Sequence, residues 1–280
     1  MSHFKAFIGA ADVAAIDEDT WHRWYLHIKK QLFARQQDKK HKKAGWSADY
    51  CKKVFGLSRS FVRWLWVRRT LPELPRNLFE KANKFTSPKK TIQTFTNEEI
   101  HDLLGRAKGK HRLLFLLLLN LGGTQKDIAD LRIDEVDLKE KTITRFRSKT
   151  EDLDIAYQVT YKLWSTTAQL LEKYMNTSGE LALTTRLGQP WVHKRLVNGR
   201  LKKADNLATV FQKYNTTDKS LKHFRKTAST RLAANPKFAS IVGYFLQHDP
   251  DTVAKKHYID PPAELIKEAC VWLGQEYGID

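Results

Sequence analysis

Three residues near the C-terminal end of the chain are of types that can act together on a phosphodiester: Arg225, His248 and Tyr258. A phosphodiester under in-line attack gathers negative charge on its nonbridging oxygens, and a fixed guanidinium can donate two charge-assisted hydrogen bonds to them. A tyrosine phenolate can attack phosphorus and form a covalent link. A tyrosine near a chain end is usually an ordinary surface residue, so only the combination with Arg225 and His248 points to chemistry.

Other short segments accompany these residues. The stretch 121–138 carries Asp127 in its acidic part, and Ser148-Lys149-Thr150 lies between two strand-like segments. Lys222-x-x-Arg225 and Leu246-Gln-His248 follow in that order. Together these segments resemble the sequence boxes of the tyrosine recombinases, the phage-integrase family, over residues 96–262. Any one of them is weak, whereas the combination is specific.

The resemblance implies an enzyme that cuts and rejoins DNA through a 3′-phosphotyrosine, with no metal and no other cofactor. Tyr258 is then the nucleophile, and Arg225 and His248 bind and support the phosphate. Lys149, in the turn of a β-hairpin, is implied as the donor of a proton to the leaving 5′ oxygen. Lys222 stands where the family has a histidine, and a lysine is a poorer general base at neutral pH.

Thr124 stands where the family has its first catalytic arginine. A hydroxyl cannot supply a fixed positive charge, and the loss of one preorganised donor typically costs ~10²–10³ in rate. Three alternatives stay open: Lys126, Arg145 or Arg147 supplies the charge, the protein cleaves slowly, or it binds DNA without cutting it. We favour an active but divergent enzyme, because the other site residues are all present together.

The composition indicates a polyanion as the partner, and the resemblance implies that this polyanion is double-stranded DNA. Lys and Arg number 49 against 31 Asp and Glu, which gives a net charge of +18, as expected of a protein that binds a polyanion. Residues 1–95 hold 20 basic and 8 acidic side chains, a net +12. The predicted DNA-binding side chains are those of two basic segments: Lys52, Lys53, Arg59, Arg145 and Arg147.

The cellular compartment is predicted from three kinds of sequence signal: cysteine spacing, a secretory signal and an apolar membrane span. Cys51 and Cys270 have neither disulfide nor zinc spacing, no secretory signal opens the chain, and the apolar run Leu113–Leu119 is too short to span a bilayer. We therefore expect a cytoplasmic, nucleoid-associated protein that does not contact membranes.

The predicted fold class is mainly α with a small β-sheet (α+β), arranged as a two-domain clamp. Residues 1–80 resemble the helical core-binding domain of the family. One helix is predicted over 17–35, beginning with an acidic cap at Asp17, and another from an N-cap at Ser47 to near Pro72. Its first helix is short or missing relative to the family, which leaves open a truncated N-terminus. Residues 81–95 are the predicted linker, and 96–280 the catalytic domain with a C-terminal helix.

The catalytic domain is predicted to open with a capping box, Thr96 with Glu99. A buried helix over 111–121, a Gly122-Gly123 break and a short helix over 125–131 follow. Two strands, 142–146 and 155–159, flank Lys149. The rest is expected to be mostly helical, with loops near 176–190, 198–206 and 249–252.

Two other functions compete with recombination. The chain can be a recombinase-fold accessory protein that binds DNA without cutting it, or a type IB topoisomerase. The apolar tail Pro261–Leu273 favours the recombinase, because family members dock such a helix on a neighbouring protomer in a tetramer on DNA. Packing of that helix on its own domain is the alternative. The resemblance also associates the chain with DNA integration and mobile elements.

Overall fold

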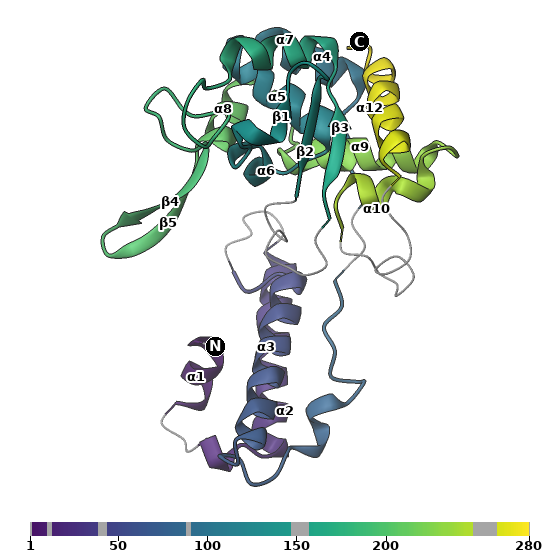
Figure 1. Ribbon diagram of the computed structural model, residues 1–280. Coiled ribbons are helices and arrows are strands. Elements are labelled where there is room, and N and C mark those ends of the chain that lie inside the picture. The colour runs from purple at the N-terminus through teal and green to yellow at the C-terminus, as the bar shows by residue number, and fades with distance from the viewer. Residues whose placement is uncertain are drawn as a thin grey trace. The chain divides into compact units, whose positions relative to one another are not determined.

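The computed structural model describes residues 2–9, 13–38, 44–87, 91–146, 157–248 and 262–279. The chain forms two compact units, Met1–Thr91 and Ile92–Asp280, and both are mainly helical (Figure 1). The predicted fold class, mainly α with small β-sheets, is confirmed. The core-binding and catalytic roles assigned to the two parts of the chain, and the clamp, remain predictions.

The N-terminal unit is built around two long helices, α2 (Glu18–Gln37) and α3 (Ala48–Val67). Each begins at a predicted cap: the Asp17 carboxylate accepts from the Thr20 amide at 2.8 Å, and the Ser47 hydroxyl accepts from the Tyr50 amide at 3.3 Å. A short helix that the sequence did not indicate, α1 (Ser2–Ile8), contacts α2, as does the 3-10 helix η2 (Arg76–Phe79). A second 3-10 helix, η1 (Val13–Ala15), precedes α2.

The predicted DNA-binding residues of α3 fall into two groups. Lys52 and Lys53 are exposed. Arg59 is half-buried, with its guanidinium 5.1 Å from the centroid of Phe55 and 5.7 Å from that of Phe79. Cation–π contacts of this kind tie Arg59 to the interior of its own unit. The two lysines are therefore better placed than Arg59 to meet a phosphate.

Helix α5 (Gly109–Leu121) lies at the centre of the C-terminal unit. Every residue from Leu113 to Leu121 is buried, as expected of a helix that is apolar all round. It packs against α4 (Asn97–Arg106), α7 (Ser165–Tyr174) and α9 (Lys222–Ala234). The predicted capping box of α4 is present, with the Thr96 amide donating to Glu99 Oε2 at 2.8 Å.

Three short antiparallel strands cover one side of this unit in the order β1-β2-β3. They are β1 (Val136–Asp137), β2 (Thr142–Arg145) and β3 (Val159–Lys162), preceded by α6 (Gln125–Ala129) and the 3-10 helix η3 (Ile133–Glu135). The predicted strand at 142–146 is confirmed. The second strand was predicted over 155–159, of which 155 and 156 lie outside the described residues. Tyr157 and Gln158 are not in a strand, and the observed strand begins at Val159, with Val159 and Tyr161 on its buried side.

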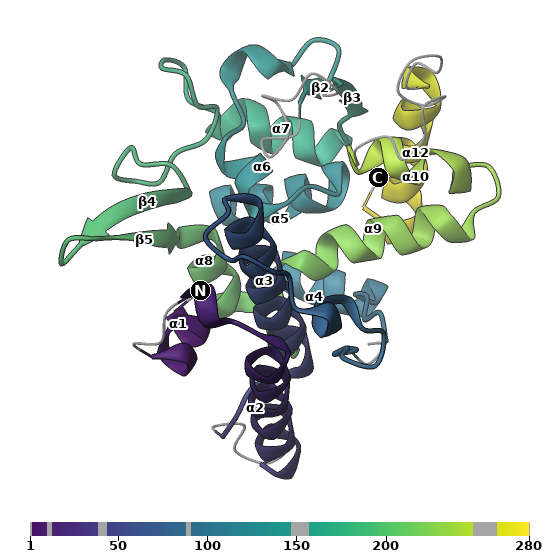
Figure 2. The same cartoon turned by 90° about the horizontal axis from the view of Figure 1, so that it is seen from below.

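A second sheet, a two-stranded hairpin, lies where the sequence was expected to give helix and loop. Strand β4 (Val192–Val197) pairs with β5 (Arg200–Asp205) through a turn at Asn198-Gly199. Both turn residues have positive φ, 50° and 70°, which is the two-residue hairpin turn that Asn-Gly favours. The predicted loop over 198–206 is therefore wrong. The hairpin leads directly into α8 (Asn206–Tyr214) and projects from the body of its unit in both views (Figures 1 and 2).

The chain closes with a 3-10 helix η4 (Ala239–Ile241), α10 (Val242–Phe245) and the C-terminal helix α12 (Ala263–Tyr277). Helix α12 contacts β3, α5 and α9 of its own unit, and Ile266, Ala269 and Leu273 are buried there. The Trp164 indole donates to the Cys270 carbonyl at 2.7 Å. The apolar face predicted to dock on a neighbouring protomer is thus largely covered by the chain itself. In the described parts of the chain no helix is both long and apolar enough to cross a membrane.

The packing of α12 generates a stability prediction. A Cβ added at Gly274 would lie 2.8 Å from two indole atoms of Trp164, whereas one added at Gly105 in α4 meets nothing within 4 Å. We expect Gly274→Ala to destabilise the protein by ~1–3 kcal/mol through overpacking. Gly105→Ala should stabilise it by ~0.5–1 kcal/mol, because alanine loses less backbone entropy in a helix. Thermal unfolding measures both, and equal midpoints would contradict this packing.

Candidate active site

The side chain of Arg225 joins two backbone segments that are distant in sequence. Its Nη1 donates to the Gly122 carbonyl at 2.8 Å, and its Nη2 donates to the Leu246 carbonyl. Gly122 ends α5 with φ of 56°, and a Cβ there would meet the Phe245 ring at 2.7 Å. Only glycine combines this backbone conformation with this close approach. The two carbonyls hold the plane of the guanidinium in one orientation.

His248 lies two residues beyond the Leu246 carbonyl that Arg225 contacts, and it is exposed. Its amide donates to the Gly243 carbonyl at 3.0 Å, and its own carbonyl accepts from the Tyr157 hydroxyl at 3.0 Å. Both the amide and the carbonyl of His248 are therefore hydrogen-bonded, and these bonds hold the backbone that carries the imidazole. Arg225 thus contacts the backbone two residues before His248, and the catalytic roles of both residues remain predictions.

Gln247 holds an unusual backbone conformation between these two contacts. Its φ is 49°, in the left-handed region that costs a non-glycine residue free energy. The resemblance places glycine at this position. The buried side-chain amide of Gln247 donates to the Arg145 carbonyl at 2.6 Å, which compensates part of that cost.

Thr124, at the expected arginine position, serves as the N-cap of α6. Its amide and its hydroxyl both donate to Asp127 Oδ2 at 2.7 Å, and the hydroxyl accepts from the Asp127 amide at 3.4 Å. The carboxylate of Asp127 is buried. Thr124 is therefore part of a capping box that satisfies a buried charge.

Arg145 is buried directly behind this capping box, with an exposed fraction of 2%. Its Nη1 donates to the Asp127 carbonyl, its Nε donates to the Phe146 carbonyl at 3.0 Å, and Glu135 Oε1 lies 3.8 Å from that Nε. Burial raises the pKa of the Glu135 carboxyl, and the charge of Arg145 opposes that rise. Arg145 was predicted to contact DNA, but its burial suits internal electrostatic support instead.

Tyr161 is a buried tyrosine of β3 whose hydroxyl bonds to the backbone near the Arg225 contact. The Tyr161 hydroxyl donates to the Phe245 carbonyl at 2.7 Å. Burial raises its pKa, a trend that the charges of Arg225 and Arg145 oppose and that of Asp127 reinforces. The hydrogen bond of Tyr161 therefore links β3 to the backbone just before Leu246.

The remaining predicted residues are more dispersed. Lys222 is exposed in the first turn of α9, and Lys126 is exposed and 3.1 Å from Asp130. Tyr258, Lys149 and Arg147 lie outside the described residues. Among the residues that are described, no group of three or more His, Cys, Asp or Glu side chains could hold a metal ion.

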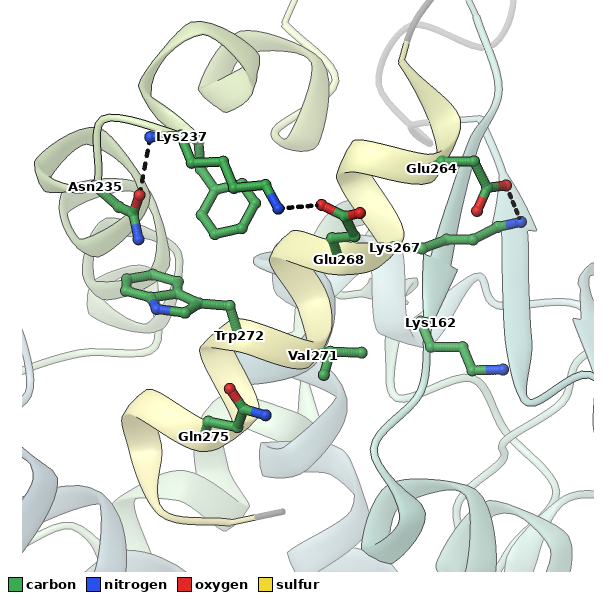
Figure 3. A pocket seen from close by; sticks show the side chains of 10 residues that line it. Lys162, Asn235, Lys237, Glu264, Lys267, Glu268, Val271, Trp272 and Gln275 are labelled. Atoms are coloured by element: carbon green, nitrogen blue, oxygen red, sulfur yellow. Dashed lines mark hydrogen bonds and ion pairs between the residues drawn. The ribbon is translucent and has the colours of Figure 1, made fainter.

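A hollow of about 590 Å³ lies apart from these residues, between α12 and the segment that follows α9. Lys237 reaches from that segment to Glu268 of α12 at 2.7 Å, beside Val271 and Trp272 (Figure 3). None of the predicted site residues lines it. It therefore belongs to the outer surface of α12 and not to the candidate active site.

Solved structures with the same architecture place this geometry in a known fold. A lambda integrase dimer bound to a COC′ core site matches with a TM-score of 0.59 and 12% identity, over 90% of this chain and 88% of that one. The Tn1549 transposon integrase in complex with circular intermediate DNA matches with a TM-score of 0.55 and 14% identity, over 92% of this chain and 85% of that one. The chain has the tyrosine recombinase fold. No protein-family model matches the sequence, and no curated protein does.

Sequence reasoning overlooked two parts of this recombinase fold. The role of Gln247 carried no local signal, because its partner Arg145 is 102 positions away. The β4–β5 hairpin did carry a signal, the Asn198-Gly199 pair, which favours a two-residue hairpin turn. The mostly polar residues on either side of that pair do not alternate with apolar ones, so they gave no strand pattern.

The conformation of Gln247 can be tested with two variants. Gln247→Gly and Gln247→Ala both lose the bond to the Arg145 carbonyl, but only alanine keeps the left-handed strain of ~1–2 kcal/mol. We expect the glycine variant to be about 1 kcal/mol more stable than the alanine variant in urea-induced unfolding. An alanine variant at least as stable as the glycine variant would show that residue 247 is not left-handed.

Proposed function

We propose that the protein is a site-specific DNA recombinase that cuts and rejoins strands through a 3′-phosphotyrosine at Tyr258. The observation that carries the proposal is the Arg225 guanidinium, held by the Gly122 and Leu246 carbonyls beside His248. A guanidinium whose orientation is set in advance can stabilise charge on phosphate oxygens without reorganising during the reaction. In this proposal the protein acts in the cytoplasm on the nucleoid or on a mobile element.

The reaction conserves the phosphodiester bond energy. Tyr258 first loses its phenolic proton to solvent; the phenolate oxygen then attacks phosphorus, a P–O bond to tyrosine forms, and the P–O bond to the 5′ oxygen breaks. Lys149 donates the proton that the departing 5′ oxygen takes up. Arg225 and His248 bear the charge of the phosphate, and exposed Lys222 adds a further donor. Attack of a 5′-hydroxyl on the phosphotyrosine then reverses these bonds and frees the tyrosine.

Arg145 is our candidate for the positive charge that Thr124 does not supply. It is the basic residue whose bonds reach both the Asp127 segment and, through Gln247, the segment that ends in His248. A buried guanidinium raises the local potential without touching the phosphate, so it replaces a direct donor only in part. We therefore expect slow cleavage.

The hydrogen bonds between Thr124 and Asp127 favour a second candidate function. With its hydroxyl used to cap α6, Thr124 offers no charge to a phosphate. A protein of this fold that binds DNA without cutting it, as an accessory factor, is the second candidate. It predicts DNA binding with no covalent product.

Self-association on DNA is part of the proposal as well. Because the inner face of α12 is covered by its own unit, a tetramer would use the outer face, where Val271 is 46% exposed. That face includes the hollow lined by Trp272 and Lys237 (Figure 3).

The nucleophile can be identified by trapping the adduct. Wild-type protein incubated with nicked suicide duplexes carrying candidate sites should give a covalent protein–DNA band on a denaturing gel. Tyr258→Phe should abolish the band, because it lacks the attacking oxygen, and should leave DNA affinity within about a few-fold. Tyr277→Phe is the matched control, since that ring is fully buried. An adduct that persists in the Tyr258→Phe protein would refute the assignment.

The charge compensation can be tested without leaving a buried charge unpaired. Arg145→Gln combined with Glu135→Gln neutralises both partners of the internal pair. We expect this double variant to form the adduct ~10²-fold more slowly with nearly unchanged affinity, by analogy with the loss of one preorganised charge. Lys126→Gln, an exposed control, should keep the wild-type rate.

Thr124→Arg completes this series. The change removes a capping box, at about 0.5–2 kcal/mol of stability. We expect no acceleration, because the Arg145 charge already occupies the region behind the site. A Thr124→Arg protein that forms the adduct at least tenfold faster, with an unaffected Arg145/Glu135 variant, would mean that the missing guanidinium is not compensated.

A further inference from the structure

The β4–β5 hairpin has no place in the chemistry described so far. Its residues 192–205 hold five basic side chains and one acidic one, and both strands are largely exposed along their length. Two strands alone are marginally stable in water and gain most of their stability from a covering partner. Among the described residues of the C-terminal unit, no other element covers the outer half of this hairpin (Figures 1 and 2).

The register of the hairpin places like charges opposite each other. Lys194 pairs with Lys203, and Arg195 pairs with Lys202. Directly opposed like charges destabilise an antiparallel pair. Lys203 is partly neutralised by Asp205 at 2.8 Å, but the Arg195–Lys202 pair faces solvent. An anion placed along this ribbon would turn the repulsion into attraction.

The tip of the hairpin is apolar. Leu196 pairs with Leu201, and each is 70% exposed. On one face the leucine pair follows the Lys194–Lys203 pair, since directly paired residues share a face. The ribbon thus presents cations along its shaft and two methyl-rich side chains near its end.

The base of the hairpin is held firmly. The Asp205 carboxylate caps α8 by accepting from the Ala208 amide at 3.0 Å, and the Asn206 amide donates to the Trp191 carbonyl at 2.9 Å. Trp191 is buried, and β4 contacts α6, the helix that Thr124 caps. The hairpin therefore starts beside the candidate active site and keeps a defined direction from it.

We propose that the β4–β5 hairpin is an arm that enters the major groove of the DNA duplex next to the cleavage position. The groove is ~12 Å wide and admits a two-stranded ribbon, and strands of this length reach ~20 Å. The leucine pair faces base edges such as thymine methyl groups, and Arg195 and Lys202, on the opposite face of the ribbon, reach phosphates at the edges of the groove. The inference rests on the proposed function, because it takes the recombinase substrate as the partner.

Binding measurements on the full chain test the phosphate contacts. We expect Arg195→Gln/Lys202→Gln to bind a mixed-sequence duplex on the order of 10–10² times more weakly than wild type at 0.1 M salt. The slope of log affinity against log salt should fall by about two. Lys139→Gln/Lys173→Gln, which removes two exposed charges elsewhere on the unit, should change neither by as much. The hairpin variant should unfold at the wild-type temperature or above, because it loses a repulsive pair.

Crosslinking tests the tip. Burial raises the pKa of Cys51 to about 11 and that of Cys270 to about 12, so both remain buried thiols at neutral pH. A benzophenone maleimide therefore labels Leu201→Cys selectively. Under ultraviolet light it should crosslink to duplex DNA, and the major-groove ligand methyl green should suppress the crosslink, whereas the minor-groove ligand netropsin should not.

The outcomes separate the two levels of inference. If wild type binds duplex DNA but the hairpin variant keeps its affinity and salt slope, the arm is refuted and the recombinase proposal stands. Crosslinks only to protein, or suppression by netropsin alone, would also refute the major-groove arm. If wild type binds no duplex DNA, both proposals fall.

Discussion

The bonds of the Arg225 guanidinium to two backbone carbonyls are the constraint on which the candidate site depends. One carbonyl belongs to Gly122, at the end of the buried helix α5, and the other to Leu246, just before His248. The left-handed conformation of Gly122 lets the chain turn there while the Phe245 ring packs against it. The core thus sets the geometry of the site, because the most buried helix of the unit positions its principal cation.

A network of polar contacts supports the two bonds of the Arg225 guanidinium. Thr124 and Asp127 close the start of α6, Arg145 binds the back of that turn, and Gln247 ties Arg145 to the backbone before His248. In the protein interior, where the dielectric constant is low, such a network stabilises the fold only if every polar group in it has a hydrogen-bond partner. Position 124 carries no charge, and the buried guanidinium of Arg145 bonds to the backbone of the same turn.

The basic side chains fall into two groups, those that stabilise their own unit and those that are exposed to solvent. Arg59, Arg145 and Arg225 are at least partly buried and hold segments of their own unit together. Lys52 and Lys53 on α3 and the cations of the β4–β5 hairpin are exposed, and there the charge is available to a polyanion. A large net charge alone does not distinguish these groups.

Local features were readable from the residue order. The caps at Asp17, Ser47 and Thr96 and the buried run of α5 are made by neighbours in sequence, and each occurs where the pattern indicated. The pairing of Arg225 with the His248 segment was inferred only through resemblance. The left-handed Gln247 and the docking of α12 on Trp164 depend on partners about a hundred residues away. The guanidinium of Arg145 turns inward to the Asp127 carbonyl, which is 18 positions away. Local propensity cannot encode such contacts, because their free energy arises only when the chain has closed around one core.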